Sequence, residues 1–356
     1  MSQQKPSGFT YQQAGVDNTS AGRAKDRIGE MVRQTYTADV LGDFGHFGGM
    51  FRSPGGGSEI LVSSADSVGT KVLLAVHADR HDGIGIDLVN HSVNDILCCG
   101  ARPLFFLDYF ATSSLEESVL GDIVAGMATA CQDAGCALIG GETAQLPGIY
   151  QENTYDLAGF IVGTVDEQSI IDGSAIRPGH ALVGLKSNGL HTNGYSLARA
   201  VFGLTEGDPG TLRERLDAHY PELGESLGEA LLRPHRSYLS MATRYIEQGI
   251  VAGMAHITGG GIPGNLERII PDSCTATVDT ESWKPIPLFE LIREHGQVEP
   301  AEMFDVFNMG IGFILVVDEA AAEQIVEQEE DAVLIGTVTA SDVSEDRVKL
   351  VGPGFE

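Results

Sequence analysis

Residues 94–110, with the sequence NDILCCGARPLFFLDYF, join the end of a predicted helix to a predicted strand. Upstream, apolar residues recur at helical spacing and predict a helix over residues 84–97. Gly100 is a plausible helix stop, and Pro103 follows shortly after it. Residues 104–110 are apolar on both faces except at one aspartate, which indicates a buried strand. A helix that leads into a buried strand favours a mixed α and β fold.

The acidic residue in this segment is the first candidate for a functional group. Asp95 stands among apolar neighbours, where a carboxylate is costly to bury unless it is paired or bound to a metal ion. Asn94 and Asp95 together could instead lie on a solvated face of the helix, and the residues alone leave both readings open. Further carboxylates lie in or beside apolar segments at Asp82, Asp87 and Asp108.

Working outward, strands and helices mix along both halves of the chain. Residues 1–57 are expected to be irregular. Further strands are predicted at residues 60–62, 72–76, 137–139, 157–165, 181–185, 253–257, 311–317, 332–337 and 347–351. A capping box at Ser114 to Glu117 opens a helix that Gly135 closes, and other helices are predicted at 194–203, 234–248, 263–270 and 318–330. The fold class is therefore α/β or α+β, and turn residues at 166–179 place a domain boundary between residues 1–172 and 173–356.

Composition excludes several classes of partner. The net charge of −28, from 50 acidic and 22 basic residues, argues against nucleic acid and anionic membranes. The same charge repels a phosphorylated substrate, so a phosphate site needs local amides, cations or Mg²⁺. The excess of negative charge either keeps the protein soluble or reflects adaptation to high salt. No apolar run approaches the roughly 20 residues of a membrane span, no signal peptide is visible, and five cysteines without zinc spacing fit a reducing compartment. A cytoplasmic protein is expected.

One glycine-bearing segment combines an acid, a hydroxyl and a lysine. Asp66 can hold Mg²⁺ through oxygen, Gly69 exposes backbone N–H groups, and Thr70 and Lys71 can face phosphate. The alternative is a β-hairpin turn with a surface lysine. A similar segment at Gly140, Gly141 and Glu142 follows a strand, and its alternative is a tight turn with an exposed glutamate.

Two further loops precede predicted helices in the second half. The first contains His191 and Asn193, and its histidine could bind phosphate or move a proton near neutral pH. The second contains His256, Thr258 and residues 259–261, which are Gly259, Gly260 and Gly261 and could offer successive amides to a phosphate. An ordinary strand-to-helix loop and a flexible glycine loop are the alternatives.

The order of these motifs resembles the phosphoribosylformylglycinamidine cyclo-ligase, or AIR synthase, family from about residue 8 to the C-terminus. An aspartate, four intervening residues and Gly-Ala-x-Pro form that family's signature, here Asp95 to Pro103. The remaining matches are Tyr11 with residues 14–17, then residues 65–71, 81–89, 140–144, 191–196, 256–261 and 307–312.

The resemblance implies ATP-dependent closure of an imidazole ring in purine biosynthesis by a two-domain homodimer whose N-terminal strands pair across the interface. It implies ATP binding in the N-terminal domain, at Asp66, Gly69, Thr70, Lys71, Asp95, Gly140, Gly141 and Glu142. By the same resemblance, Asp66, Asp95 and Glu142 are the Mg²⁺ candidates. Lys71 and His191 are the catalytic candidates, and the phosphoribosyl substrate meets His191, Asn193, His256, Thr258 and Gly259 to Gly261.

Two departures and one competing activity accompany this resemblance. The family usually has Thr-Asp-Gly at residues 65–67, where this chain has Ala65-Asp66-Ser67. It usually has Gly-Gly-Phe-Gly at residues 42–45, where this chain has Asp43 in second place. Another ATP-dependent enzyme of the same fold, such as a small-molecule kinase, is the nearest competing function, and a silent nucleotide-binding subunit is a more distant one.

Overall fold

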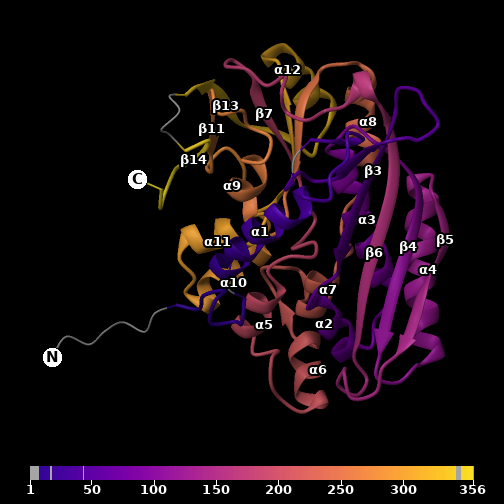
Figure 1. Ribbon diagram of the computed structural model, residues 1–356. Helices are drawn as coiled ribbons and strands as arrows, with labels where there is room; N and C mark the ends of the chain where they lie inside the picture. Colours follow the sequence, from indigo (N-terminus) through magenta and orange to yellow (C-terminus); the bar gives the residue numbers. More distant parts are fainter. Residues whose placement is uncertain (1–7, 17, 43, 342–345, 356) are drawn as a thin grey trace.

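A computed structural model describes residues 8–16, 18–42, 44–341 and 346–355 of the chain (Figure 1). Two six-stranded sheets organise these residues, and helices pack between and around them. The mixed α and β class expected from the sequence is confirmed. Asp43, one of the two departures from the family pattern, lies outside the described residues.

The first sheet belongs to the N-terminal half, and its strands run in the order β1-β2-β3-β6-β4-β5. Its strands are β1 (Val40–Leu41), β2 (Gly49–Arg52), β3 (Glu59–Ser67), β4 (Arg102–Thr112), β5 (Ala137–Gln145) and β6 (Tyr155–Asp166). β4 and β5 are parallel, and the remaining neighbours are antiparallel. The helices α3 (Asp82–Leu97) and α4 (Glu117–Ala134) pack on one face of this sheet.

Several expectations for this half need correction. Residues 72–76 form part of the helix α2 (Lys71–Ala78) and not a strand, because Lys71, Leu74, Ala75 and Ala78 are buried at helical spacing. Residues 1–57 are not irregular throughout, since they contain α1 (Asn18–Arg33) as well as β1 and β2. The capping box does not form, because α4 starts at Glu117 without a side-chain cap.

The glycines at residues 140 and 141 lie inside a strand. β5 continues to Gln145, so the strand is longer than the predicted residues 137–139, and the alternative of a tight turn is wrong. A Cβ atom on Gly141 would lie 2.2 Å from Oδ1 of Asp108 on the neighbouring strand β4. Glycine is therefore needed where the two backbones and the Asp108 side chain approach closely.

The second sheet belongs to the C-terminal half, and its order is β10-β12-β7-β13-β11-β14. Its strands are β7 (Ala181–Lys186), β10 (Val251–His256), β11 (Cys274–Asp279), β12 (Ile311–Val317), β13 (Ala332–Ala340) and β14 (Val348–Val351). All residues of β12 are buried, as expected for a central strand that reads as a continuous apolar run. A short hairpin of β8 (His219–Tyr220) and β9 (Glu225–Ser226) stands apart from this sheet.

Helices surround the second sheet. They are α5 (Tyr195–Val201), α6 (Pro209–Asp217), α7 (Leu227–Leu232), α8 (Leu239–Glu247), α9 (Gly261–Leu266), α10 (Pro287–Gly296), α11 (Pro300–Val306) and α12 (Glu319–Gln328), and a 3-10 turn, η1 (Glu167–Ser169), follows β6. The expected helix over residues 234–248 starts only at Leu239, because residues 233–238 run without helical structure toward the N-terminal half.

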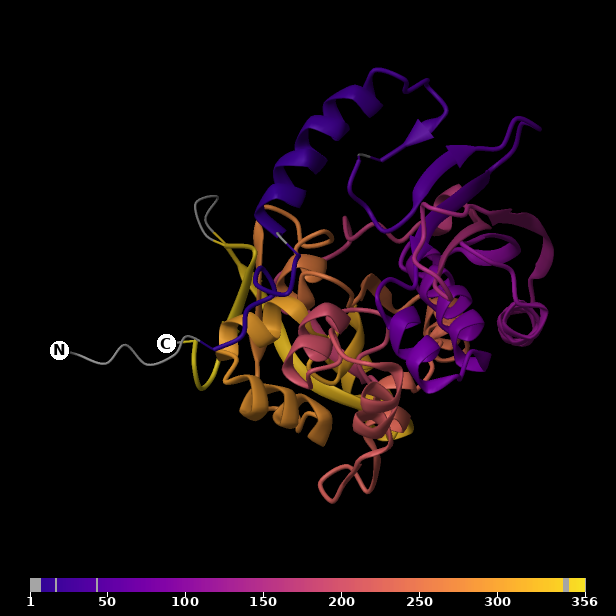
Figure 2. The same ribbon diagram turned by 90° about the horizontal axis from the view of Figure 1, so that it is seen from below.

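The two halves meet along α2 and α3. α2 contacts α6 and α7, and α3 contacts α8 and β10. Seen from below, α1 lies at the edge of the molecule (Figure 2). It lies beside the C-terminal half, at the same edge as the first strands of the N-terminal sheet. No helix in the described part of the chain is both long and apolar enough to cross a membrane.

Candidate active site

Helix α3 presents three polar side chains on the face that meets the C-terminal half. Asp87, His91 and Asp95 are four residues apart, so they share one face of the helix. All three are buried, with Asp95 only 8% exposed. Asn94 is also buried, and its side chain bonds to backbone atoms of Arg236 and Tyr238. The alternative of a solvated helix face is therefore wrong.

The structure brings two of the three expected Mg²⁺ ligands together. Asp66 comes from the end of β3, and the Ser64 hydroxyl lies 3.3 Å from Oδ2 of Asp66 and 3.2 Å from Oδ2 of Asp95. The pKa of each carboxyl is raised to about 6, mainly by burial; at Asp66, His91 lowers the pKa and the neighbouring Asp95 raises it. Two carboxyl groups in this proximity cannot both ionise without a compensating positive charge.

Histidines connect these carboxyl groups through a ring of close polar contacts across the two halves. Nδ1 of His256 lies 2.7 Å from Oδ1 of Asp95, and its Nε2 lies 3.1 Å from Nε2 of His235. Nδ1 of His235 lies 3.4 Å from the Thr192 hydroxyl, which also bonds to Nδ1 of His91 at 2.8 Å. Nε2 of His91 lies 3.4 Å from Oδ1 of Asp66, which returns the ring to its start.

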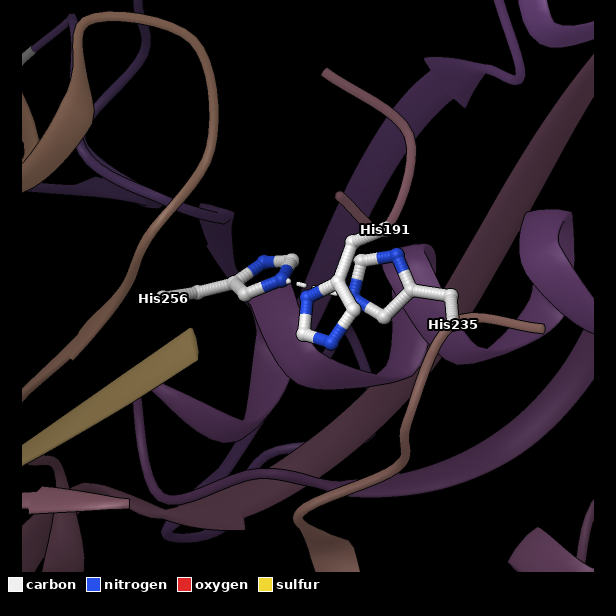
Figure 3. A group of neighbouring side chains, drawn as sticks. All are labelled: His191, His235 and His256. Atoms are coloured by element: carbon white, nitrogen blue, oxygen red, sulfur yellow. Dashed lines mark hydrogen bonds between the residues drawn. The ribbon is translucent and has the colours of Figure 1, made fainter. Parts of the chain in front are cut away.

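His191 lies against this ring. Its imidazole stacks on that of His235, as Figure 3 shows, and the two ring centroids are 4.0 Å apart. Its Nε2 bonds to Oδ1 of Asn188, and its Nδ1 has no hydrogen-bond partner among the described residues. Burial, first of all, lowers the pKa of His191 well below the ordinary value. The imidazole is therefore neutral at pH 7 and has a nitrogen available to accept or hold a proton.

Lys71 does not occupy the position expected of a phosphate contact. Its side chain is fully buried, and Nζ lies 2.8 and 2.7 Å from the two carboxylate oxygens of Asp87. Nζ also donates to the backbone carbonyl oxygens of Arg233 and His191, at 2.8 and 3.3 Å. Because an ammonium group has three donors, none is left for a phosphate. The expectation that Lys71 binds phosphate is corrected: it is an internal ion pair that ties α2 and α3 to two C-terminal loops.

Glu142 does not join Asp66 and Asp95 within one chain. The register of the first sheet places Glu142 of β5 in one row with Ser67 of β3. The residues between them in this row are Tyr109 of β4 and Ala158 of β6. Glu142 therefore lies three strands away from β3, roughly 14 Å at the usual strand spacing.

The two sites also lie on opposite faces of the sheet. Asp66 shares the helix-covered face of the sheet with the buried residues Ile60 and Val62. Ser67 points to the other face, because side chains alternate along a strand. Glu142 is in register with Ser67 across the sheet and therefore points to that other face too. Glu142 is exposed, as its alternative reading proposed, and Gly140 and Gly141 lie with it on the edge strand. Convergence of all three acids on one ion is thus wrong for the single chain.

The turn after β3 brings Gly69 and Thr70 to the C-terminal half. Gly69 has a φ of +69°, which favours glycine, and the Thr70 hydroxyl lies 3.2 Å from that of Ser196. The segment leads from a strand into a helix, so the β-hairpin alternative is wrong. Ser67, the other departure from the family pattern, is the exposed last residue of β3.

The triple glycine lies beside the loop that contains Asn193. A Cβ on Gly259 would lie 3.3 Å from Oδ1 of Asn193, and Gly260 and Gly261 have φ values of +93° and +60°. Asn265 holds this loop, since its side-chain amide donates to the carbonyl oxygens of Thr258, Gly259 and Gly261. The loop is therefore shaped by specific hydrogen bonds, and its reading as a flexible linker is wrong.

Four residues of the site were not expected from the sequence. His91 stands four residues from both Asp87 and Asp95, and this spacing could have identified it. His235, Thr192 and Asn265 carry no comparable signal, because their roles depend on contacts between segments far apart in the chain.

Comparison with known proteins agrees with this geometry. Residues 49–165 match AIR synthase related protein, N-terminal domain, and residues 177–349 match AIR synthase related protein, C-terminal domain. The chain is 46% identical over 334 residues to the phosphoribosylformylglycinamidine cyclo-ligase of Alkaliphilus metalliredigens (strain QYMF), covering 92% of this chain and 94% of that protein. It is 47% identical over 347 residues to the enzyme of the same name from Syntrophotalea carbinolica, covering 96% and 97%.

Solved structures with lower identity share the fold. The structure of AaThiL complexed with AMPPCP and TMP has a TM-score of 0.62 and 16% identity, and the match covers 93% of this chain and 94% of that one. The structure of T. maritima PurL complexed with AMPPCP has a TM-score of 0.55 and 15% identity, covering 92% and 45%. Identity over nearly the whole length, and not the fold alone, places the protein: this chain belongs to the phosphoribosylformylglycinamidine cyclo-ligase family, whose members are ligases of purine biosynthesis.

Proposed function

We propose that the chain uses ATP to close the imidazole ring of 5-aminoimidazole ribonucleotide from formylglycinamidine ribonucleotide. The observation that carries the proposal is the pair of carboxyl groups of Asp66, which is half-buried, and Asp95, which is buried, against neutral histidines where the two halves meet. Relatives at 46–47% identity with this reaction in their names support the choice of substrate.

The reaction overcomes a poor leaving group. Transfer of the γ-phosphoryl group of ATP to the formyl oxygen of the substrate releases ADP and gives an iminophosphate. The amidine-side nitrogen then attacks the formyl carbon, phosphate leaves with the former formyl oxygen, and the nitrogen loses a proton as the ring closes. A site for this chemistry has to hold polyphosphate, exclude water and accept one proton.

The chemistry of the donors at Asp66 and Asp95 fits Mg²⁺. Carboxylate oxygens are the ligands that Mg²⁺ prefers, and these two raised-pKa carboxyls lack a lysine or arginine ion pair among the described residues. A magnesium ion held there would offset negative charge on the transferring phosphoryl group. We keep Glu142 as a proposed ligand only in a dimer, since one chain does not place it near the pair.

On the substrate side, we propose roles for the loops that face this pair. The amides of Gly259 to Gly261 and the side chains of Asn193 and Thr258 would position the phosphoribosyl substrate, with His256 held in place by Asp95. Nδ1 of His191 would take the proton released on ring closure, because it is buried and has no partner in the described chain.

The role of His191 can be tested by separating turnover from binding. General base help contributes roughly 10²–10⁴-fold to a rate. His191→Ala should therefore reduce kcat by about that factor while changing KM far less. A variant with near-normal kcat and a raised KM would show that His191 binds substrate and moves no proton.

We further propose a homodimer through the face of the first sheet that α3 and α4 leave uncovered. Phe51, Ile139 and Phe160 are apolar and 39–59% exposed, and Phe160 and Phe51 lie on strands of that sheet. Exposed apolar patches of this kind mark interaction surfaces. Phe160→Glu should convert the dimer to a monomer in light scattering, and an unchanged mass would exclude this face.

Five free thiols also support a reducing, cytoplasmic compartment as the proposed location. Within the chain, we propose the boundary between the two domains at residues 172 and 173, between η1 and β7.

An assay with both substrates tests the proposed reaction. Purified protein with ATP, Mg²⁺ and formylglycinamidine ribonucleotide should form ADP and the aminoimidazole product in equal amounts. ADP formed together with a phosphorylated product that keeps the open chain would indicate a kinase of the same fold. No consumption of ATP would indicate a silent nucleotide-binding protein.

A further inference from the structure

Three buried imidazoles of the proposed active site bring their nitrogen atoms close together. Nδ1 or Nε2 atoms of His191, His235 and His256 all lie within 4.8 Å of one another, and the three side chains are at most 1% exposed. They come from the loop before α5, the segment before α8 and the strand β10, and Figure 3 shows the rings facing each other. The cluster therefore results from the tertiary fold and not from a local motif.

The hydrogen bonds around His235 fix which of its nitrogens holds a lone pair. Oδ1 of Asn94 accepts from the backbone N–H of Tyr238, and its Nδ2 donates to the carbonyl oxygen of Arg236. The amide orientation of Asn94 is thus determined, and the same Nδ2 lies 3.3 Å from Nε2 of His235. Because Nδ2 can only donate, Nε2 of His235 is the nitrogen without a proton, and a metal ion would take its electron pair in place of this 3.3 Å bond.

The same argument applies to His256. Its Nδ1 lies 2.7 Å from Oδ1 of Asp95, so an ionised Asp95 holds the proton on Nδ1 and leaves the lone pair on Nε2. The Nε2 atoms of His256 and His235 are only 3.1 Å apart. Two lone pairs at this distance repel unless a cation lies between them or Asp95 keeps a proton.

We propose that His191, His235 and His256 form a binding site for a transition-metal dication of the Zn²⁺ class. Neutral imidazoles bind Zn²⁺, Co²⁺ and Ni²⁺ well, whereas Mg²⁺ prefers oxygen ligands. The site is therefore chemically distinct from the Mg²⁺ site proposed at Asp66 and Asp95. It rests on the geometry of the histidines and does not require the proposed ring-closing activity.

The distances suit such an ion. A tetrahedral zinc with bonds of about 2.05 Å separates two nitrogen ligands by roughly 3.3 Å, close to the 3.1 Å between His235 and His256. Nδ1 of His256 bonds to Asp95, and Nδ1 of His235 bonds to Thr192. Zinc-binding histidines commonly have outer-shell support of this kind.

The third ligand, His191, offers the partnerless Nδ1. Its ring lies within 18° of parallel to that of His235, so it has to tilt before its lone pair points at the same ion. We therefore expect His235 and His256 to contribute more to affinity than His191. A solvent molecule would complete the coordination.

Occupancy of this site has a consequence for the neighbouring carboxyl. A metal ion on Nε2 of His256 strengthens the hydrogen bond from Nδ1 to Asp95 and holds Asp95 in its ionised form. Zn²⁺ would also occupy Nδ1 of His191, the nitrogen that we propose takes the proton during ring closure. We expect Zn²⁺ to slow turnover without competing with ATP.

The test uses the full-length protein at pH 7.5 with Co²⁺ and Zn²⁺ as probes. Co²⁺ should give the intense visible d–d bands of a tetrahedral nitrogen site, and Zn²⁺ should displace it at one ion per chain. Prolonged equilibration is needed because the ligands are buried. Both measurements are made in excess Mg²⁺, which saturates weak sites on the acidic surface.

Two variants distinguish the site from adventitious binding. His235→Gln should abolish the Co²⁺ bands and weaken Zn²⁺ binding by more than about 100-fold, the upper end of the loss seen for outer-shell changes. His91→Gln is the matched control, because His91 belongs to the same cluster but its nitrogens bond to Thr192 and Asp66. The control should keep the bands.

The proposal is overturned if the wild-type protein shows no tetrahedral Co²⁺ spectrum, since His235 and His256 would then share a proton through a hydrogen bond only. It is also overturned if His235→Gln retains Zn²⁺ as tightly as His91→Gln. Both outcomes are independent of the ring-closing assay, so failure of the metal site and failure of the proposed function can be told apart.

Discussion

Helix α3 contributes one aspartate to each of two polar clusters, and the clusters differ in how completely their charged groups are paired. Asp87 of α3 faces Lys71, whose ammonium group uses all three donors inside the protein. Two turns further along, Asp95 faces Asp66 and a set of histidines, and neither carboxyl forms an ion pair with a lysine or arginine among the described residues. In the first, closed cluster, the carboxylate and the ammonium group are fully paired. The second, open cluster, in contrast, lacks a positive charge that would balance its two carboxyl groups.

This difference separates structural from reactive polar groups better than residue type does. A buried lysine beside a glycine turn suggests a phosphate contact, yet its partners leave it nothing to donate. Paired carboxyls without a cation are costly to keep and are characteristic of functional sites. The four predictions below test this contrast.

The largest effect is expected from breaking the closed cluster. Lys71→Met leaves Asp87 buried without its partner, which should cost roughly 3–5 kcal/mol of unfolding free energy. Urea denaturation followed by circular dichroism measures this. Lys284→Met, at an exposed lysine, is the control and should unfold like the wild type. If Lys71→Met kept full stability and lost only ATP turnover, Lys71 would be a ligand contact after all.

Next in size is the loss of a carboxylate from the open cluster. Asp95→Asn keeps the size of the side chain but removes a proposed Mg²⁺ ligand, and turnover should fall by at least about 100-fold. The fold should survive, because the amide can still bond to Ser64. Initial rates at increasing Mg²⁺ concentration measure the effect. Activity within a few fold of the wild type would remove Asp95 from the reaction.

The pH dependence of stability gives a smaller effect whose sign is fixed. Burial raises the pKa of Asp95 from 3.8 to about 6, so the folded chain holds this proton over a pH range in which the unfolded chain has lost it. Stability contributed by the protonated form is therefore present below pH 4 and is lost as pH rises toward 6.

In metal-free buffer, wild-type protein should lose on the order of 3 kcal/mol from this group across that range, relative to Asp95→Asn. Denaturation midpoints at several pH values provide the comparison. Parallel curves for the two proteins would mean that the Asp95 carboxyl is ionised throughout.

The smallest effect concerns the turn between β3, which contains Asp66, and α2, which contains Lys71. Gly69→Ala places a side chain at a φ of +69° with open space around it, so only backbone strain of about 1 kcal/mol is expected. Gly57→Ala, in open space without a positive φ, should cost less. Thermal unfolding of both variants tests this, and a much larger loss at Gly69 would mean that the turn contacts more than the structure shows.

The sequence predicted the elements with strong periodicity. Helix α3 and strand β12 were expected because their apolar residues follow helical spacing or form a continuous run. It misassigned residues 72–76, where two valines suggested a strand although the burial spacing is helical. It also missed α1, whose polar sequence gives little hydrophobic signal.

For the candidate site, the sequence predicted some of the residues that lie together but not how they are arranged. Asp66 and Asp95 were expected together, and they are. Glu142 was expected beside them, but strand alternation in β3 and the strand order of the sheet put it on the other face. The pairing of Lys71 with Asp87, and of His235 with His256, depends on contacts between distant segments that no local pattern reveals.

A crystal structure with Mg²⁺ and the non-hydrolysable analogue AMPPCP tests the contrast between the two clusters most directly. We predict a magnesium ion about 2.1 Å from oxygens of both Asp66 and Asp95, with Lys71 still bonded to Asp87. Magnesium bound elsewhere, with Nζ of Lys71 on a phosphate oxygen, would contradict the account.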